Sequence, residues 1–192
     1  MNRDLFYEIG TEEIPARYIN NALKEMKDIL TKNLNDLNIQ FEEIDIKATP
    51  RRFAILVKNI SEKQADLHEE YKGPAKKIAY DEQGNPTKAL TGFVKGKNGL
   101  LENVELRKIG DDEYVYLSVE KEGKETKIFV KYILENVVRG VNFPKPMRWA
   151  GKNLKFIRPI RWFICVFHGE HQGFDIEDIK TTKFTKGHRF LS

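Results

Sequence analysis

Arginine and tryptophan lie side by side twice in the C-terminal quarter of the sequence, in the segments 146–149 (PMRW) and 159–162 (PIRW). The chain has no other tryptophan, and the stretch 142–169 contains no acidic residue. The planar guanidinium of arginine can bind a phosphate through two hydrogen bonds, and the ring of tryptophan offers a face on which a base can stack. The doubled pattern is therefore typical of a surface that contacts RNA.

Burial is the competing explanation for the second copy. If 162–167 forms a strand, Trp162, Ile164 and Val166 share one face, and an apolar face of this kind belongs to a hydrophobic core. Trp149 precedes an expected turn, so it is the better candidate for an exposed ring.

Positive charge is concentrated at the same end of the chain. Residues 141–192 contain ten Lys or Arg and four Asp or Glu, a net charge of +6, whereas residues 1–140 carry −2 and the whole chain carries +4. Such a local excess attracts phosphate polymers or acidic partners. A solvated basic face without a partner is the alternative explanation.

Cysteine and histidine form weaker patterns. Cys165, His168 and His171 have the spacing C-x-x-H-x-x-H, but neighbouring strand positions point to opposite faces and no fourth ligand is near in sequence, so we expect no metal site. His188 could donate to a phosphate or could be a solvated side chain. The sequence shows neither a G-x-x-x-x-G-K-[ST] loop nor a G-x-G-x-x-G after a strand, so it contains no recognisable nucleotide-binding motif.

Three glutamates, Glu8, Glu12 and Glu13, could perform acid and base chemistry. Carboxylates at the start of a helix also stabilise the helix dipole, which needs no catalytic role. We therefore expect no catalytic residue among them.

The elements that must position these residues begin in the order β-α-β-β. We expect strands at 5–9, 41–46 and 53–60. Apolar residues at helical spacing predict an amphipathic helix that ends near Leu37. A second amphipathic helix is expected over about 126–138.

Further strands are expected as a hairpin of 104–109 with 114–120 and as the apolar run 162–167. Together these elements predict an α+β fold with mixed or mainly antiparallel sheets and two main amphipathic helices. We expect two domains, a β-α-β-β unit over 1–66 and a second α+β unit with the basic stretch over 67–192.

Length and composition favour a folded chain without a membrane anchor. Of the 192 residues, 40% are hydrophobic and 11% aromatic, which is more than a disordered chain shows. The single cysteine, Cys165, cannot form an internal disulfide, which fits a reducing compartment. No apolar run is long enough for a secretory signal or a membrane span, so we expect a cytoplasmic protein with no membrane partner.

Four stretches, read together, resemble one protein family. They are EIGTEEIP (8–15), ATPRRFAILV (48–57), FPKPMRWAG through RPIRWF (143–163) and KGHRFL (186–191), and the shorter DEQGNPTKALTGF (81–93) agrees with them. In this order, over nearly the whole chain, they resemble the N-terminal region of the β subunit of the bacterial heterotetrameric glycyl-tRNA synthetase.

The resemblance implies part of a longer subunit in an α2β2 enzyme that attaches glycine to tRNA-Gly. It implies that the α subunit holds the class II aminoacylation site with ATP and Mg²⁺, so this chain is expected to need no cofactor and to be non-catalytic. It also implies that the β subunit provides most of the contact with tRNA. Later domains of such a subunit, including the C-terminal anticodon-binding one, are expected to lie outside this sequence.

The basic motifs and the resemblance together suggest a set of RNA contacts, with no role assigned to any single residue. The candidates are Arg51, Arg52, Lys145, Arg148, Trp149, Arg158, Arg161, Lys186, His188 and Arg189. Trp162 and Gly187 belong to the same motifs.

Two other functions stay open. The arginines and tryptophans could instead join core and subunit interfaces in a structural scaffold of the same complex, without touching RNA. The chain could also be a free-standing RNA-binding domain that has no part in charging tRNA.

Overall fold

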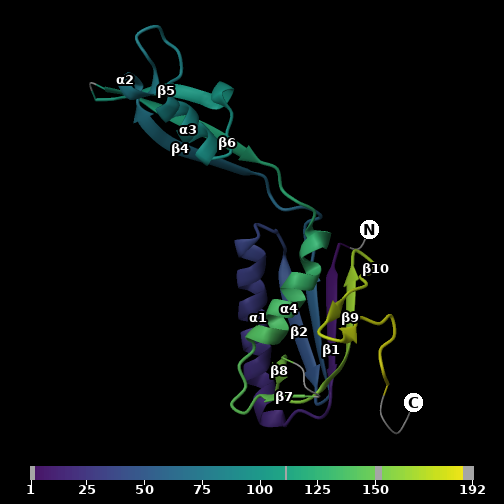
Figure 1. Cartoon of the computed structure of the whole chain (residues 1–192). Helices are drawn as coiled ribbons and strands as arrows, with labels where there is room; N and C mark the ends of the chain where they lie inside the picture. The colour runs from purple at the N-terminus through teal and green to yellow at the C-terminus, as the bar shows by residue number, and fades with distance from the viewer. Residues whose placement is uncertain (1–2, 111, 150–152, 188–192) are drawn as a thin grey trace. The chain divides into compact units, whose positions relative to one another are not determined.

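The computed structural model describes residues 3–110, 112–149 and 153–187, which form two compact units (Figure 1). Unit 1 combines the chain up to Gln64 with the chain from Lys124 onward, and unit 2 is the continuous segment Ala65–Gly123. The sequence-based division into 1–66 and 67–192 has its boundary within two residues of the start of unit 2 at Ala65. It differs in that the C-terminal stretch returns to the first unit, because a late strand pairs with the first strand of the chain.

Unit 1 is built on a five-stranded antiparallel sheet with the strand order β10-β9-β1-β3-β2. The chain begins β-α-β-β, and both this order and the α+β fold expected from the sequence are confirmed. Two helices, α1 and α4, accompany the sheet (Figure 1). The bounds of these elements are β1 (Leu5–Thr11), α1 (Ala16–Asp36), β2 (Glu43–Thr49), β3 (Arg52–Lys58), α4 (Val130–Gly140), β9 (Ile160–Phe167) and β10 (Glu170–His171).

Helix α1 forms because its buried residues recur every four positions. Ala22, Met26, Leu30 and Leu34 make one apolar stripe, which packs on the sheet within the main core. The helix ends at Asp36, and Asn38 follows with a positive φ of 52°.

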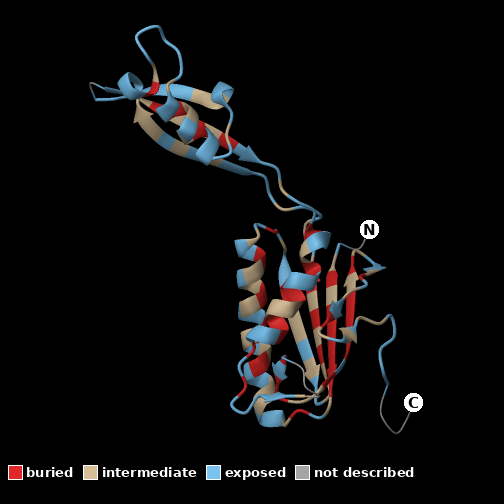
Figure 2. Cartoon of the chain, in the orientation of Figure 1, coloured by how far each residue is buried: buried red, intermediate tan, exposed pale blue. Residues whose placement is uncertain are grey.

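Helix α4 follows the 3-10 turn η2 (Thr126–Phe129) and packs against α1. Its buried residues Ile133, Leu134 and Val137 join the same core, and Figure 2 shows the buried segments in red on α1, α4 and the strands of the sheet. The Tyr7 hydroxyl of β1 donates to the carbonyl of Val130 (2.5 Å), so the helix start is tied to the central strand. Burial also raises the pKa of the Tyr7 hydroxyl.

Two short hairpins complete unit 1. The pairs are β7 (Met147–Arg148) with β8 (Lys155–Phe156), and β11 (Asp175–Ile176) with β12 (Ile179–Lys180). Strand β9 is buried at almost every position, and burial raises the pKa of its Cys165 thiol.

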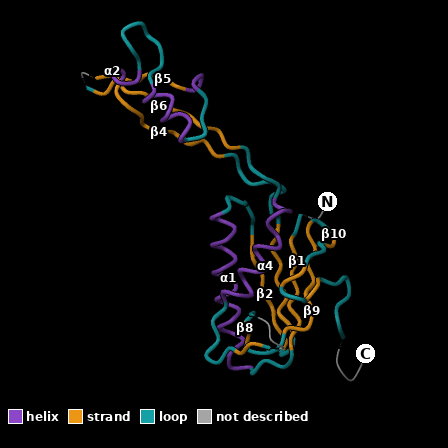
Figure 3. The backbone as a smooth tube through the Cα atoms, viewed as in Figure 1, coloured by secondary structure: helices purple, strands orange, loops and turns teal. Residues whose placement is uncertain are grey.

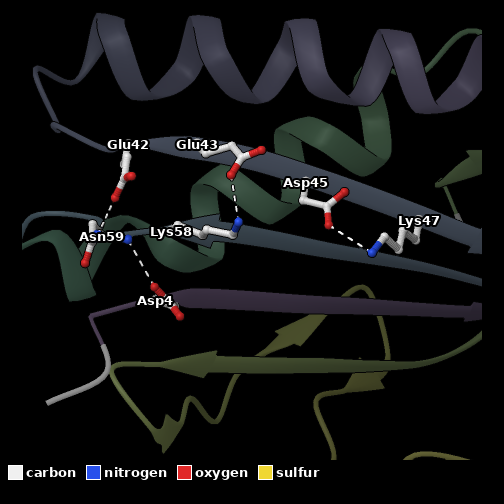
Figure 4. A network of polar contacts seen from close by, with 7 residues as sticks. All are labelled: Asp4, Glu42, Glu43, Asp45, Lys47, Lys58 and Asn59. Atoms are coloured by element: carbon white, nitrogen blue, oxygen red, sulfur yellow. Dashed lines mark hydrogen bonds and ion pairs between the residues drawn. The ribbon is translucent and has the colours of Figure 1, made fainter.

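Charged side chains line the free edge of the sheet at β2 (Figure 4). Lys58 Nζ donates to Glu43 (2.7 Å), which raises the pKa of Lys58, and Asp45 pairs with Lys47 at 3.2 Å. The N–H of Asn59 donates to Asp4 (3.0 Å), and its side chain donates to Glu42. Charges at a sheet edge oppose pairing with a strand of another chain, so this network protects the edge.

Unit 2 has its own sheet and core. Three antiparallel strands in the order β4-β6-β5 carry short helices, and the expected hairpin appears as β5 and β6, with Gly110 at a φ of 65° in the turn. Its core consists of Ala79, Leu90, Val94, Val115, Leu117 and Val119. The elements are β4 (Leu67–Ala75), α2 (Lys76–Ala79), α3 (Lys88–Gly96), η1 (Leu101–Asn103), β5 (Val104–Ile109) and β6 (Asp112–Lys121).

The segments that lead into and out of unit 2 lie side by side (Figure 3). The N–H of Gln64 donates to the carbonyl of Lys124 (2.9 Å), and the N–H of Lys124 donates to the Gln64 side chain (3.1 Å). Unit 2 is therefore an insertion whose two ends are joined within unit 1. No helix in the described part of the chain has both the length and the apolarity to cross a membrane.

Because those ends are already hydrogen-bonded, we expect unit 1 to fold without unit 2. Replacement of residues 65–123 by a short Gly-Ser linker should retain one cooperative unfolding transition, since each doubling of loop length changes the free energy by only about 0.6 kcal/mol. Circular dichroism with thermal unfolding of the shortened chain measures this. Loss of the cooperative transition would show that unit 1 needs unit 2 for its fold.

Candidate functional site

The sequence motifs meet at one end of the sheet in unit 1. In the strand register, Gly10 of β1 lies opposite Arg52 of β3 on one side and Trp162 of β9 on the other. Past the end of β1, the N–H of Glu12 donates to the carbonyl of Pro159 (3.0 Å), and the N–H of Thr11 donates to that of Arg51 (2.9 Å). Three of the stretches that carry the family resemblance therefore form one continuous structure.

The centre of this structure is the carboxylate of Glu8. Only 4% of this residue is exposed. The indole Nε1 of Trp162 donates to Glu8 Oε1 at 2.7 Å, and the hydroxyl of Thr185 donates to the same oxygen at 2.6 Å. Arg52 Nε lies 3.3 Å from that oxygen as an ion pair without hydrogen-bond geometry. A buried carboxylate is tolerated when it is paired and hydrogen-bonded, and this one is both.

Arg52 connects this centre to the C-terminal segment. Its Nη2 donates to the backbone carbonyl of Lys186, and its guanidinium carbon lies 5.9 Å from the centroid of the Trp162 ring. Lys186 Nζ lies 5.5 Å from the same ring centroid. Both distances fall within the range of a cation–π contact.

Gly10 leaves room for the indole of Trp162. A Cβ atom at this position would lie 1.9 Å from Cε2 of the ring, which is far inside contact distance. No other residue type fits here without displacement of the ring. The packing of Trp162 therefore explains why the EIGTEEIP stretch has a glycine at position 10.

A second layer of pairs surrounds Glu8. Glu12 lies 3.4 Å from Arg161 Nε and 3.7 Å from an Nη of Arg51, and Arg158 Nε donates to the carbonyl of Glu13 (2.9 Å). Helix α1 has no acidic residue in its first turn. The carboxylates of Glu8 and Glu12 therefore pair with arginines, and none of the three glutamates lies in the first turn of α1, where the sequence pattern had suggested support of the helix dipole.

The predicted contact residues fall into two groups. Arg51, Arg52 and Arg158 are partly buried and hold the structure together, whereas Lys145, Arg148, Arg161 and Lys186 are exposed. His188 and Arg189 lie outside the described residues.

The two tryptophans behave differently. Trp162 is buried, with 5% exposed, as its strand pattern predicts. Trp149 is only partly exposed, because its Nε1 donates to the carbonyl of Phe156 (3.2 Å). Sequence reasoning missed Thr185, whose link to Glu8 has no local signal.

Cys165 and His168 of the C-x-x-H-x-x-H pattern pack within the fold. Cys165 is buried in β9, and His168 stacks on Phe167 with Nε2 3.1 Å from the carbonyl of Ile60. Among residues 3–110, 112–149 and 153–187, no group of three or more His, Cys, Asp or Glu is placed to hold a metal ion.

Comparison with known proteins points to a single family. The family model described as "Glycyl-tRNA synthetase beta subunit" matches residues 5–192. The chain is 43% identical over 191 residues to the glycine–tRNA ligase beta subunit of Clostridioides difficile (strain 630), and 42% identical over 189 residues to that of Bacillus subtilis (strain 168). These alignments cover 100% and 98% of this chain but 28% of each relative, so the chain spans just over a quarter of their length.

Replacement of Gly10 by alanine should destabilise unit 1 by about 2 to 4 kcal/mol, because the new methyl group displaces the indole and breaks its hydrogen bond to Glu8. Urea unfolding measures the effect. Gly173→Ala is the matched control, since a Cβ there meets no atom within 4 Å. Equal stability of the two variants would contradict the packing role of Gly10.

Removal of the Glu8 carboxylate should also be costly. Glu8→Ala leaves the Trp162 N–H and the Thr185 hydroxyl without their acceptor and the Arg52 guanidinium without its ion-pair partner, at a cost of about 3 to 5 kcal/mol. Glu13→Ala is the control, because Glu13 is exposed and contacts Arg158 through its backbone carbonyl. Thermal unfolding should rank Glu8→Ala well below Glu13→Ala, and the reverse order would refute the central role of Glu8.

Proposed function

The chain belongs to the glycyl-tRNA synthetase beta subunit family, and we propose that it works as the N-terminal part of such a subunit. In this role it supports the ATP-dependent attachment of glycine to tRNA-Gly by holding tRNA and by assembling with the alpha subunit. It makes and breaks no bond itself. The aminoacylation site, with ATP and Mg²⁺, belongs to the alpha subunit of an α2β2 enzyme in the cytoplasm.

The charge of unit 1 supports the tRNA-binding part of this proposal. Unit 2 contains nine Lys or Arg and twelve Asp or Glu, a net charge of −3. Since the whole chain carries +4, the remaining residues carry +7. An RNA backbone is attracted to the unit with the positive excess.

One observation carries the proposal: the exposed cations of the β7–β8 hairpin. Arg148 lies opposite Lys155 in the strand register, and Lys145 precedes the hairpin; all three are exposed. None of the ion pairs among the described residues uses them. Cations without a carboxylate partner remain available for phosphates, which position an RNA without reading its sequence.

A second role, contact with the alpha subunit, is favoured by exposed apolar residues on unit 1. Ile128 and Tyr132, four positions apart on η2 and α4, are 60% and 53% exposed. Large apolar side chains at helical spacing are suited to burial in a subunit interface.

Charge reversal tests the tRNA contact. In the complete alpha–beta enzyme, Lys145→Glu with Arg148→Glu should weaken tRNA-Gly binding and lower the slope of log Kd against log salt by about two, one for each lost phosphate contact. Filter binding over a salt series measures both quantities.

The matched control is Lys24→Glu with Lys27→Glu, which makes the same change of net charge on two exposed lysines of α1. This pair should leave both the affinity and the slope close to the wild-type values. If the two double variants behave alike, net charge alone attracts the tRNA and the hairpin is not its contact.

A further inference from the structure

Unit 1 contains a pocket of about 270 Å³ beside the Glu8 centre. Among the residues that the structure describes, its lining combines two aromatic side chains, aliphatic side chains and two cations, without a carboxylate. The lining residues are Trp149, Leu154, Phe156, Pro159, Ile160, Arg161, Ile179 and Lys186.

The apolar wall of this pocket is part of the main core and is held in place. Phe156 is 1% exposed and meets the rings of Phe143 and Phe53 edge-on, with centroids 4.9 and 6.4 Å away. Its carbonyl accepts the hydrogen bond of the Trp149 indole, which fixes one edge of that ring. The flat, apolar side of the pocket is thus preformed.

The two cations are positioned by Glu12 and by the Glu8 centre. Arg161 is anchored through Nε to Glu12, while its side chain is 56% exposed. The backbone of Lys186 is held by Arg52, and the preceding Thr185 is bonded to Glu8. The Arg161 side chain and the Lys186 backbone therefore have fixed positions at the pocket.

We propose that this pocket binds one unstacked nucleotide, with the base against Trp149 and Ile160 and the phosphate between Arg161 and Lys186. Pockets for drug-sized ligands have volumes of about 300 to 1,000 Å³, so this one suits a ligand no larger than about one nucleotide. Aromatic and apolar walls take the face of a base, and paired cations take its phosphate.

The proposal deepens the proposed function and in part rests on it, because an RNA held at the exposed cations can deliver a single-stranded nucleotide to the pocket. A free nucleotide has the same chemistry as a nucleotide in a strand. The two sources differ in affinity, since only a strand also reaches cations outside the pocket.

Tryptophan fluorescence of this chain tests the pocket. The probes are the four ribonucleoside 5′-monophosphates and a single-stranded ribotetranucleotide with a 5′-phosphate. Stacking on Trp149 should quench emission with saturation, and Trp149→Phe should remove the quenching, since Trp162 is buried. Tighter binding of the tetranucleotide indicates an RNA source, and equal or tighter binding of a monophosphate indicates a free nucleotide; both support the pocket.

Two variants with matched controls locate the binding. Lys186→Gln should raise the Kd of the tetranucleotide about fivefold, whereas Lys183→Gln, on an exposed lysine outside the pocket, should not change it. Ile179→Phe should fill the pocket and abolish quenching, whereas Ile179→Val should retain it. Circular dichroism confirms that each variant is folded.

The pocket proposal is overturned if no probe quenches emission at low salt, if Trp149→Phe retains the quenching, or if Ile179→Phe binds as the wild type does. These outcomes are separable from the proposed function. Binding of tRNA that depends on Lys145 and Arg148 without any quenching would refute the pocket alone. Quenching without such tRNA binding would refute the tRNA contact and leave the pocket standing.

Discussion

One buried carboxylate connects the elements on which this end of unit 1 depends. Glu8 lies in the central strand, and its partners come from β3, from β9 and from the C-terminal segment, up to 177 positions away in the sequence. Removal of this carboxylate would leave a charge and two donors unpaired in a poorly solvated place, so the segments are interdependent. The geometry of Lys186 and Arg161 follows from this centre and from Glu12 beside it.

The arginines of the basic motifs divide between architecture and surface. Arg51 pairs with Glu12, Arg52 pairs with Glu8, and Arg158 donates to the backbone carbonyl of Glu13. Lys145, Arg148 and Lys155 are instead exposed and have no carboxylate partner among the described residues. A count of positive charge treats both kinds alike. The placement of the carboxylates and the exposure of each side chain together distinguish cations that fold the chain from cations available to a polyanion, and Arg161, which pairs with Glu12 but is 56% exposed, has both properties.

The sequence predicted those helices and strands whose formation depends on residues close together in the chain. The four-residue spacing in α1, the apolar run of β9 that buries Trp162, and the β5–β6 hairpin were all visible in the sequence. The return of the chain after Gly123 to unit 1 was not, because the pairing of β1 with β9 depends on no nearby residue. For the same reason, the sequence did not show that Arg52 and Arg161 have carboxylate partners. These partners, Glu8 and Glu12, are far away in the sequence, and their position before a helix suggested a role at the helix dipole.

The insertion of unit 2 between β3 and β9 also sets an order in time. As the chain leaves the ribosome, β1 can pair with β3, but its other edge stays open until residues 160–167 have been made. Unit 2 consists of contiguous residues and can complete its sheet during that interval. The nascent protein therefore passes through a stage in which its central strand, β1, has one unpaired edge, and such an open edge is a site for aggregation until β9 pairs with it.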